Sequence, residues 1–196
     1  IEDHEIELAY FPTPILETPK SSRDTSTSLK KFIGFALNAE LTRLVEERFN
    51  VLTRDSFGMT EIGMGLLVPD TVNSDAALNS CGLPAAFRDV KIVDDNGNEV
   101  ESGISGELWV KGAGIIDGYY KKPKANKETF IDGWFRTGDI FVADKLGFYT
   151  IVGRMKDMIR RSMENISALE VETAIRSKQG IEDAAAIAVP DKKRDE

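Results

Sequence analysis

The sequence predicts an α+β fold made of the end of an α/β layer, a small antiparallel, barrel-like β region and the beginning of a small α+β domain. Three observations lead to this prediction. Strand-like, helix-like and strand-like patterns follow one another within residues 6–57, as at the edge of an α/β layer. Short strand patterns separated by turn residues fill residues 80–153, and a further strand and a helix follow from residue 158.

The elements of the first region are predicted from the period of their apolar residues. Residues 6–10 alternate between apolar and polar or small side chains, which is typical of a short strand. A helix is predicted to begin after Asn38, its N-cap, because apolar residues then recur at helical spacing at Leu41, Leu44, Val45 and Phe49. Residues 51–57 read as the next strand.

The later elements are predicted from turn chemistry. An Asp-Asn-Gly turn at residues 95–97 marks a hairpin, and residues 144–147 mark a second turn within an aromatic, strand-rich stretch. Ser167 and Glu170 have the spacing of a capping box, so a helix is expected to open there and to end before Gly180. Residues 184–189 read as a last strand, closed by Pro190.

The composition excludes several classes of function. The 196 residues carry 25 basic and 33 acidic side chains, and the net charge of -8 argues against nucleic acid or an anionic membrane surface as the main partner. Cys81 is the only cysteine, so no internal disulfide is expected and a cytoplasmic setting is the simplest interpretation. His4 is the only histidine, which excludes a histidine-rich zinc site. No apolar run approaches the roughly 20 residues of a membrane span.

The first candidate site is the SFGMTE segment, which follows a strand pattern. Glycine lets a ligand approach the backbone, the aromatic ring suits a purine face, the hydroxyl can donate to a phosphate, and the carboxylate suits a hard cation such as Mg²⁺. The residues are Ser56, Phe57, Gly58, Met59, Thr60 and Glu61. An ordinary strand-to-loop turn is the competing interpretation, and the segment is not a P-loop.

Two further positions suit a nucleoside. Asp139 ends the WFRTGD segment, where a carboxylate can accept both hydroxyls of a ribose, although a turn-capping aspartate explains it equally well. Arg154 follows Gly153 and offers a permanent positive charge to ribose or phosphate oxygens, with an ordinary surface arginine as the alternative. The GELW segment at 106–109 and the Gly-Tyr pair at 118–119 read as a structural hairpin and turn.

These segments, in this order, resemble the motifs of the adenylate-forming superfamily of acyl-CoA synthetases, luciferases and peptide-synthetase adenylation domains. Residues 56–61 resemble its Tyr-Gly-x-Thr-Glu motif, residues 106–119 its Gly-Glu-Leu to Gly-Tyr motif, and residues 134–139 its Trp-Tyr-Arg-Thr-Gly-Asp motif. Residues 153–172 resemble its hinge motif, with a sequence closer to acyl-CoA ligases than to peptide synthetases. Residues 160–162, 164–167 and 194–196 look closest to crotonobetaine/carnitine-CoA ligases.

The resemblance implies a two-step reaction with ATP, Mg²⁺ and CoA. A small carboxylic acid attacks the α-phosphate to give acyl-AMP, and CoA then displaces AMP. It implies that Asp55 and residues 56–60 line the adenine and α-phosphate, that Glu61 holds Mg²⁺, and that Asp139 and Arg154 hold the ribose. Lys156 marks the hinge, and the CoA side is implied to involve Ser162, Glu164 and Asn165.

The resemblance also implies a division into domains. Residues 1–153 correspond to the C-terminal part of the large AMP-binding domain, with an α/β edge at 1–70 and a β-rich subdomain at 80–153. Residues 154–157 correspond to the hinge, and residues 158–196 to an incomplete small domain.

Three residue types depart from the family pattern. Met163 stands where glycine is usual, on a loop expected to approach the pantetheine arm, so it is expected to hinder the thioester step. Phe57 replaces the usual tyrosine. The segment GFAL at 34–37 is a poor copy of the small-residue loop that touches adenine.

The chain is expected to be an internal piece of such a protein. It begins without methionine and ends in the charged run 191–196. The Ser/Thr/Gly-rich phosphate loop and the lysine of the small domain that drives adenylation are both missing from it. We therefore expect no ligase activity from the chain alone. Two other interpretations remain: an enzyme that loads a carrier protein instead of CoA, and a noncatalytic homologue with a vestigial pocket.

Overall fold

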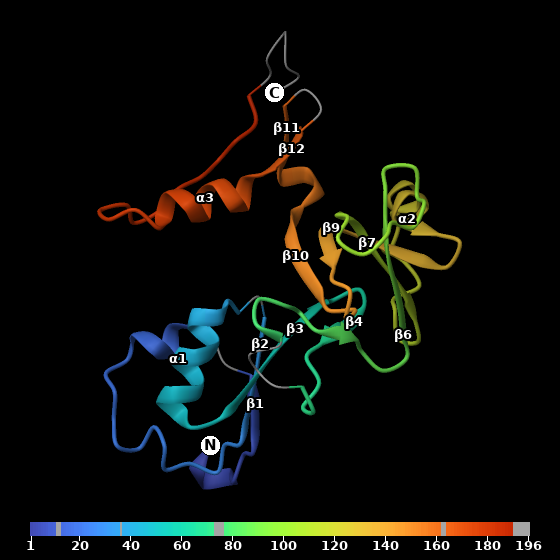
Figure 1. Cartoon of the computed structure of the whole chain (residues 1–196). Helices are drawn as coiled ribbons and strands as arrows, with labels where there is room; N and C mark the ends of the chain where they lie inside the picture. The colour runs from blue at the N-terminus through green and yellow to red at the C-terminus, as the bar shows by residue number, and fades with distance from the viewer. Residues whose placement is uncertain (11–12, 36, 73–76, 162–163, 190–196) are drawn as a thin grey trace. The chain divides into compact units, whose positions relative to one another are not determined.

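The structure is a computed structural model that describes residues 1–10, 13–35, 37–72, 77–161 and 164–189 (Figure 1). The chain forms two compact units. The first consists of Ile1–Arg88, Gly112–Ile116 and Gly147–Thr150, and the second of Asp89–Lys111, Asp117–Leu146 and Ile151–Glu196. Residues 56–61 lie within the first unit, and residues 134–139 and 153–172 within the second.

A five-stranded sheet with the order β1-β2-β3-β4-β5 forms the first unit. Strands β1 (Leu8–Tyr10), β2 (Lys31–Phe35) and β3 (Leu52–Met59) run parallel. Strands β4 (Gly63–Leu67) and β5 (Leu83–Pro84) continue the sheet in antiparallel pairing. Two 3-10 turns, η1 (Glu2–His4) and η2 (Thr13–Glu17), flank β1.

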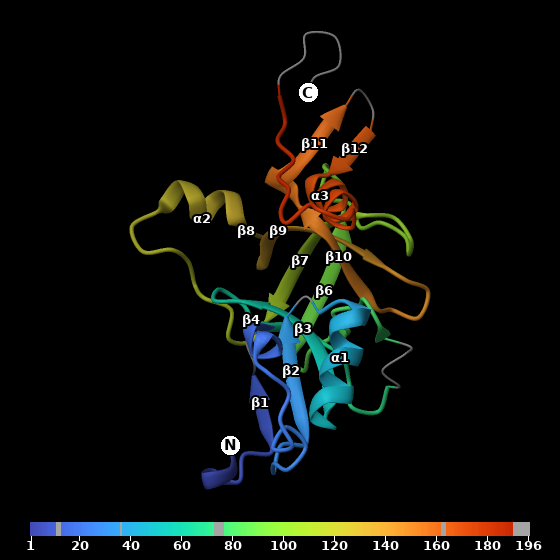
Figure 2. The same cartoon turned by 90° about the vertical axis from the view of Figure 1, so that its left-hand side faces the viewer.

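Helix α1 (Ala39–Phe49) connects β2 to β3 and packs beside this sheet (Figures 1 and 2). The side chain of Asn38 accepts a hydrogen bond from Leu41 N at 2.8 Å, which satisfies one of the free amides of the first turn. The apolar face of the helix packs into a buried cluster with residues of β2 and of the segments next to β2 and β3. The buried members are Leu29, Phe32, Leu37, Val45, Phe49 and Val51.

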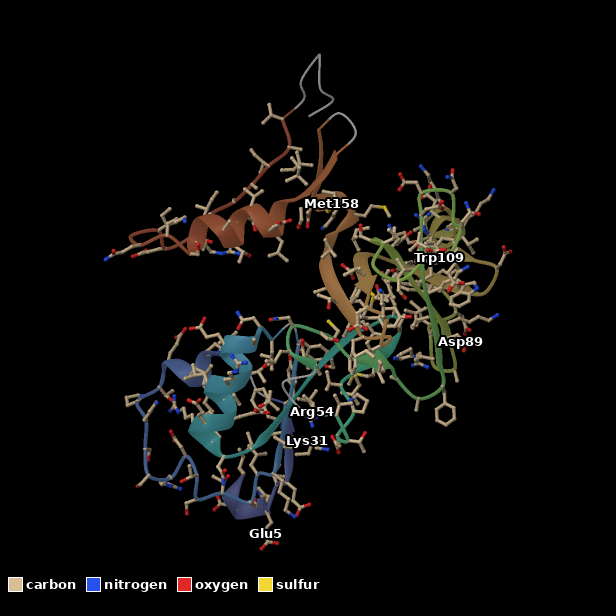
Figure 3. The ribbon with its side chains drawn as sticks, in the orientation of Figure 1. Glu5, Lys31, Arg54, Asp89, Trp109 and Met158 are labelled. Carbon is tan, nitrogen blue, oxygen red and sulfur yellow. The ribbon has the colours of Figure 1, made fainter. Side chains whose placement is uncertain are left out.

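Two buried arginines fasten loops to this unit. Arg48 on α1 donates to the carbonyls of Leu16 and Pro19 and from Nε to Asp24 Oδ2 at 2.8 Å, so the loop before β2 is held against the helix. Arg54 on β3 donates to the carbonyls of Asp70 and Val72. Arg54 and Lys31, which forms an ion pair with Asp70, lie close together (Figure 3).

A second five-stranded sheet, with the order β10-β9-β7-β6 and β8 paired to β9, forms the body of the second unit. Its strands are β6 (Arg88–Val93), β7 (Gly106–Gly112), β8 (Phe130–Ile131), β9 (Trp134–Ala143) and β10 (Tyr149–Arg154). The pairs β7–β9 and β8–β9 are antiparallel. Helix α2 (Pro123–Thr129) precedes β8 and begins with proline, whose missing amide costs nothing there.

The end of the second unit is a hairpin followed by a helix. The 3-10 turn η4 (Met155–Asp157) leads into β11 (Met158–Arg161), which pairs antiparallel with β12 (Glu164–Ser167). Helix α3 (Ala168–Arg176) begins after Ser167, whose hydroxyl accepts from Glu170 N at 3.3 Å and donates to Val152 O at 2.9 Å. The predicted capping serine is therefore confirmed.

The α+β class, α1 with its cap, and the hairpin turns agree with the sequence prediction. Strand β2 was not predicted. The strand predicted at residues 184–189 is wrong, because no strand pairs with this segment in the described chain, and Ile187 is 77% exposed. Ser162, Met163, Pro190 and residues 191–196 lie outside the described residues. The hinge and the domain boundaries placed around it stay predictions.

In the described part of the chain, no helix is both long enough and apolar enough to cross a membrane.

Candidate functional site

The first motif, SFGMTE at residues 56–61, spans the end of β3 and the turn into β4. Strand β3 continues to Met59, so Ser56, Phe57, Gly58 and Met59 are paired in the sheet and only the rest of the motif forms the turn. A Cβ added to Gly58 would lie 2.4 Å from Gly63 O, so only glycine permits this close pairing at a β-bulge. Thr60 is exposed and Glu61 half-buried, and both lie in the turn.

Two polar residues that precede the turn are buried inside the first unit. Asp55 Oδ2 accepts a hydrogen bond from Leu37 N at 3.2 Å, next to the start of α1. The Ser56 hydroxyl donates to Gly34 O at 2.8 Å and is almost fully buried. The side chain of Ser56 therefore ties β3 to β2.

The second motif, WFRTGD at residues 134–139, lies inside β9 of the second unit. Glu107 pairs with Ile140 and Trp109 with Arg136, so three residues of β9 bulge opposite the single residue between them on β7. Gly138, in this bulge, has φ of +71°, which favours glycine. The bulge turns Asp139 into the interior, where it is 1% exposed.

Glu107 holds this bulge and was interpreted from the sequence as purely structural. Its Oε1 accepts from Gly138 N at 3.1 Å, and its Oε2 accepts from Trp109 Nε1 at 2.8 Å and from Arg136 Nε at 2.9 Å. The carboxylate is buried. Glu107 and Gly138 are too far apart in the sequence for a local pattern to reveal the contact, although a carboxylate within a buried β pattern is an unusual signal.

Asp139 and Arg154 are brought together by the fold. Arg154 Nε lies 3.0 Å from Asp139 Oδ1, and the arginine side chain is 54% exposed while that of Asp139 is 2% exposed. The other oxygen, Asp139 Oδ2, is buried and has no hydrogen-bond partner among the described residues. A buried acceptor of this kind calls for a donor such as water or a ligand hydroxyl.

Burial raises the pKa of the Asp139 carboxyl above its usual value of 3.8. The positive charge of Arg154 opposes this increase in pKa, and the negative charge of Glu107 adds to it. The carboxyl is therefore held at a position where a donor to Oδ2 would favour its charged form.

The remaining predicted residues belong to the second unit. Lys156 is exposed in η4, between β10 and β11. Glu164 and Asn165 lie in β12, and nothing further is described of their side chains. A hollow of about 790 Å³ in this unit is lined by Trp109 and Met158 (labelled in Figure 3) among others. Of the predicted site residues whose side chains the structure describes, none lines it.

The residues of the first motif fit a magnesium ion brought by a nucleotide. In the described residues, no group of three or more His, Cys, Asp or Glu side chains is placed to hold a metal. Mg²⁺ commonly binds through one or two carboxylates together with phosphate oxygens and water, so a single glutamate in a turn suffices. Glu61 is the only acidic residue of that turn.

The profile of the family described as AMP-binding enzyme matches residues 1–120. The chain is 39% identical over 135 residues to a feruloyl-CoA synthase of Amycolatopsis sp., and this alignment covers 69% of the chain and 28% of that protein. It is 40% identical over 151 residues to a long-chain-fatty-acid–CoA ligase of Salmonella typhimurium, with 75% and 27% covered. It is 39% identical over 154 residues to a crotonobetaine/carnitine–CoA ligase of Proteus mirabilis, with 76% and 30% covered.

A solved structure shows the same fold. The O-succinylbenzoate coenzyme A synthetase of Bacillus subtilis, in complex with ATP and magnesium ion, matches with a TM-score of 0.84 and 26% identity. The match covers 98% of this chain and 41% of that one. The chain thus spans less than a third of the length of the three curated relatives.

Proposed function

The chain belongs to the AMP-binding enzyme family, and on this premise we propose that the protein containing it is an ATP-dependent acid–thiol ligase. It would join a carboxylic acid to AMP with release of pyrophosphate, and then transfer the acyl group to CoA. Support for this proposal comes from the family profile over residues 1–120 and from the order of the motifs. The chain alone, which spans a minor part of its relatives, is expected to be inactive.

The observation that carries this proposal is the paired Asp139 and Arg154. A buried carboxylate with one oxygen bound to an arginine and the other without a partner among the described residues is suited to accept ribose hydroxyls. A donor from the ligand would compensate for the burial that raises the pKa of Asp139, so nucleotide binding and ionisation of Asp139 would favour each other.

We assign the phosphate end of the nucleotide to the first motif. Thr60 would donate its hydroxyl to a phosphate oxygen, and Glu61 would hold Mg²⁺. Bound Mg²⁺ supplies positive charge to the phosphate oxygens. Residues 55–59 would line the adenine: Asp55 and Ser56 from within the sheet, and Phe57, Gly58 and Met59 through their half-buried surfaces. Lys156 would act as the hinge, and Ser162, Glu164 and Asn165 would lie toward CoA.

For the acid we propose a crotonobetaine- or carnitine-like substrate. The support is the likeness of residues 160–162, 164–167 and 194–196 and the 39% identity to the Proteus mirabilis ligase. The Salmonella typhimurium and Amycolatopsis relatives match at 40% and 39% identity, and their names specify long-chain fatty acids and a feruloyl group, so those acids are the necessary competitors in any assay.

The test is ATP–pyrophosphate exchange by the complete protein, driven in parallel by crotonobetaine, a long-chain fatty acid and ferulate. We expect exchange with the first acid, and its loss in Asp139→Ala and Glu61→Gln variants with the fold intact. A second assay would offer CoA and a phosphopantetheinylated carrier protein as acceptors. No exchange with any acid, together with no binding of Mg·ATP at millimolar concentration, would favour a noncatalytic homologue instead.

A further inference from the structure

The turn that carries Thr60 and Glu61 receives hydrogen bonds from other segments of the first unit. We call residues 60–63 the motif turn. Within it, Ile62 N donates to Met59 O at 3.1 Å, which closes the turn. The carbonyl of Glu61 accepts a hydrogen bond from Ile116 N, and that of Ile62 accepts one from Arg88 Nη2. The geometry of the motif turn therefore depends on groups distant in sequence.

Arg88, which is the first residue of β6 but belongs to the first unit, supplies one of these two donors. Its Nη2 donates to Ile62 O at 2.8 Å, and its Nε donates to Met64 O at 3.1 Å. Its Nη1 donates to the carbonyls of Ala113 and Phe87. One guanidinium thus joins the motif turn to the segment Gly112–Ile116 of the same unit.

The same segment holds the turn a second time. Ile116 N donates to Glu61 O at 2.9 Å. Gly63 has φ of +62°, and the Arg88 Nη2 atom would lie 3.7 Å from a Cβ placed there. Arg88 and Ile116 N therefore fix the backbone of Glu61 and of the residue after it from one side.

We propose that Arg88 is a positioning residue for the nucleotide site, which holds the motif turn so that Thr60 and Glu61 meet the phosphates and Mg²⁺. This inference rests on the proposed function. Arg88 would act through the carbonyls of the turn and its neighbours, and not on a reacting group. Because both site residues lie in a short turn, a shift of about 1 Å in its backbone is enough to lower the rate on the order of 100-fold.

The contact requires arginine and not merely a positive charge. The guanidinium presents five donors in a fixed plane, which lets it reach Ile62 O, Met64 O and Ala113 O together. A lysine ammonium is a single point at the end of a flexible stem and would satisfy fewer of these separated carbonyls. Arg88→Lys should therefore behave as a partial loss, between the native protein and Arg88→Met.

Arg48 offers a matched control. It is also an arginine of the first unit that donates to several backbone carbonyls, but these belong to Ile15, Leu16 and Pro19 in the loop before β2. Arg48→Met should destabilise the first unit without altering the motif turn. Arg48→Lys serves in its place if Arg48→Met fails to fold.

In the complete protein, ATP–pyrophosphate exchange is measured over a range of Mg²⁺ concentrations. We expect Arg88→Met to lower kcat/KM for ATP on the order of 10- to 100-fold and to raise the Mg²⁺ concentration needed for half-maximal rate. Arg88→Lys should lie between, and Arg48→Met should leave the Mg²⁺ dependence unchanged. Equal losses in Arg88→Met and Arg48→Met, with unchanged Mg²⁺ dependence, would overturn the proposal.

A second measurement on this chain does not depend on catalysis. Amide hydrogen exchange should be about tenfold faster at Ile62 and Ile116 in Arg88→Met, and unchanged at Asn50, whose amide bonds to Glu46 O. Arg48→Met should not accelerate exchange at Ile62 or Ile116. Unchanged exchange at both isoleucines would refute the proposal that Arg88 holds the motif turn. If the native protein shows no pyrophosphate exchange, the proposed function fails while this measurement still decides the role of Arg88.

Discussion

Replacing Glu107 by glutamine is predicted to destabilise the second unit by about 3 kcal/mol. Both carboxylate oxygens accept hydrogen bonds: Oε1 from Gly138 N, and Oε2 from Trp109 Nε1 and from Arg136. An amide has only one acceptor oxygen, so its NH2 group must face at least one of these donors. The orientation that loses fewer hydrogen bonds places the NH2 group at the Oε1 position, facing Gly138 N. The amide oxygen then keeps the bonds from Trp109 and Arg136 that Oε2 accepts in the native protein.

The magnitude follows from two contributions. Leaving the Gly138 amide unsatisfied costs roughly 1–3 kcal/mol, because it loses its acceptor and meets another donor. Removing the negative charge weakens the hydrogen bonds from Arg136 by about 1 kcal/mol in total, a value reduced because the arginine side chain is 33% exposed. Since whole domains are stable by only about 5–15 kcal/mol, a change of this size is readily measured.

Tryptophan fluorescence during guanidinium unfolding is the appropriate assay. The chain has two tryptophans, and both Trp109 and Trp134 belong to the second unit, so the signal reports on that unit alone. Glu101→Gln, which changes an exposed glutamate of the same unit, is the matched control and should shift the free energy of unfolding by less than about 0.5 kcal/mol. A loss below 1 kcal/mol for Glu107→Gln would refute the reasoning that this carboxylate holds the bulge.

Three further predictions concern single side chains. Because burial raises the pKa of Asp139, the folded state binds its proton more tightly, so the contribution of this carboxyl to the stability of the second unit should fall as pH rises from 3.8 through the raised pKa. The free energy of unfolding of the native protein relative to Asp139→Asn, measured by fluorescence, should therefore be lower at pH 7 than at pH 3, and an equal difference at both pH values would contradict this. Phe87 has φ of +62° and is 86% exposed, so Phe87→Gly should stabilise the first unit by roughly 0.5–1 kcal/mol in calorimetry. A lowered melting temperature would contradict this. Ser167→Ala removes the cap of α3 and the hydrogen bond to Val152 O, and should lower the free energy of unfolding by about 1 kcal/mol in the fluorescence assay. An unchanged free energy of unfolding would contradict this prediction.

The elements that sequence reasoning found are those stabilised by local chemistry. Helix α1 was predicted because its cap, Asn38, and its apolar spacing are both local signals. Helix α3 was predicted from Ser167 in the same way. The turns at 95–97 and 144–147 were predicted from residues that adopt turn conformations whatever their surroundings.

The elements that were missed depend on partners elsewhere in the chain. Strand β2 has five residues and contains glycine, so its pattern is weak, yet it lies between β1 and β3 and is held on both sides. The segment at 184–189 shows the opposite error, because its apolar pattern suits a strand but no described strand pairs with it. Pairing, and not composition, separates these two segments.

The candidate site divides along the same line. The residues proposed to touch the nucleotide, such as Glu61 and Asp139, were found because they stand in short motifs with chemical meaning. The long-range contacts that hold those motifs in shape were not found, although the GELW segment that contains Glu107 was predicted to be structural. Glu107 reaches Gly138 across the β7–β9 pair, and Arg88 reaches Ile62 from beyond β5.

This division explains why each motif alone is a weak predictor of function. Glu61 and Asp139 are positioned by a turn and by a bulge, and in both cases one charged side chain outside the motif satisfies the backbone that the motif leaves unpaired. The turn leaves a carbonyl to be satisfied, which requires a donor such as the positively charged Arg88. The bulge leaves the Gly138 amide to be satisfied, which requires an acceptor such as the negatively charged Glu107. A homologue that keeps both motifs but lacks these two partners is therefore expected to fold with a displaced turn or bulge, and to bind Mg·ATP more weakly than its motifs alone would suggest.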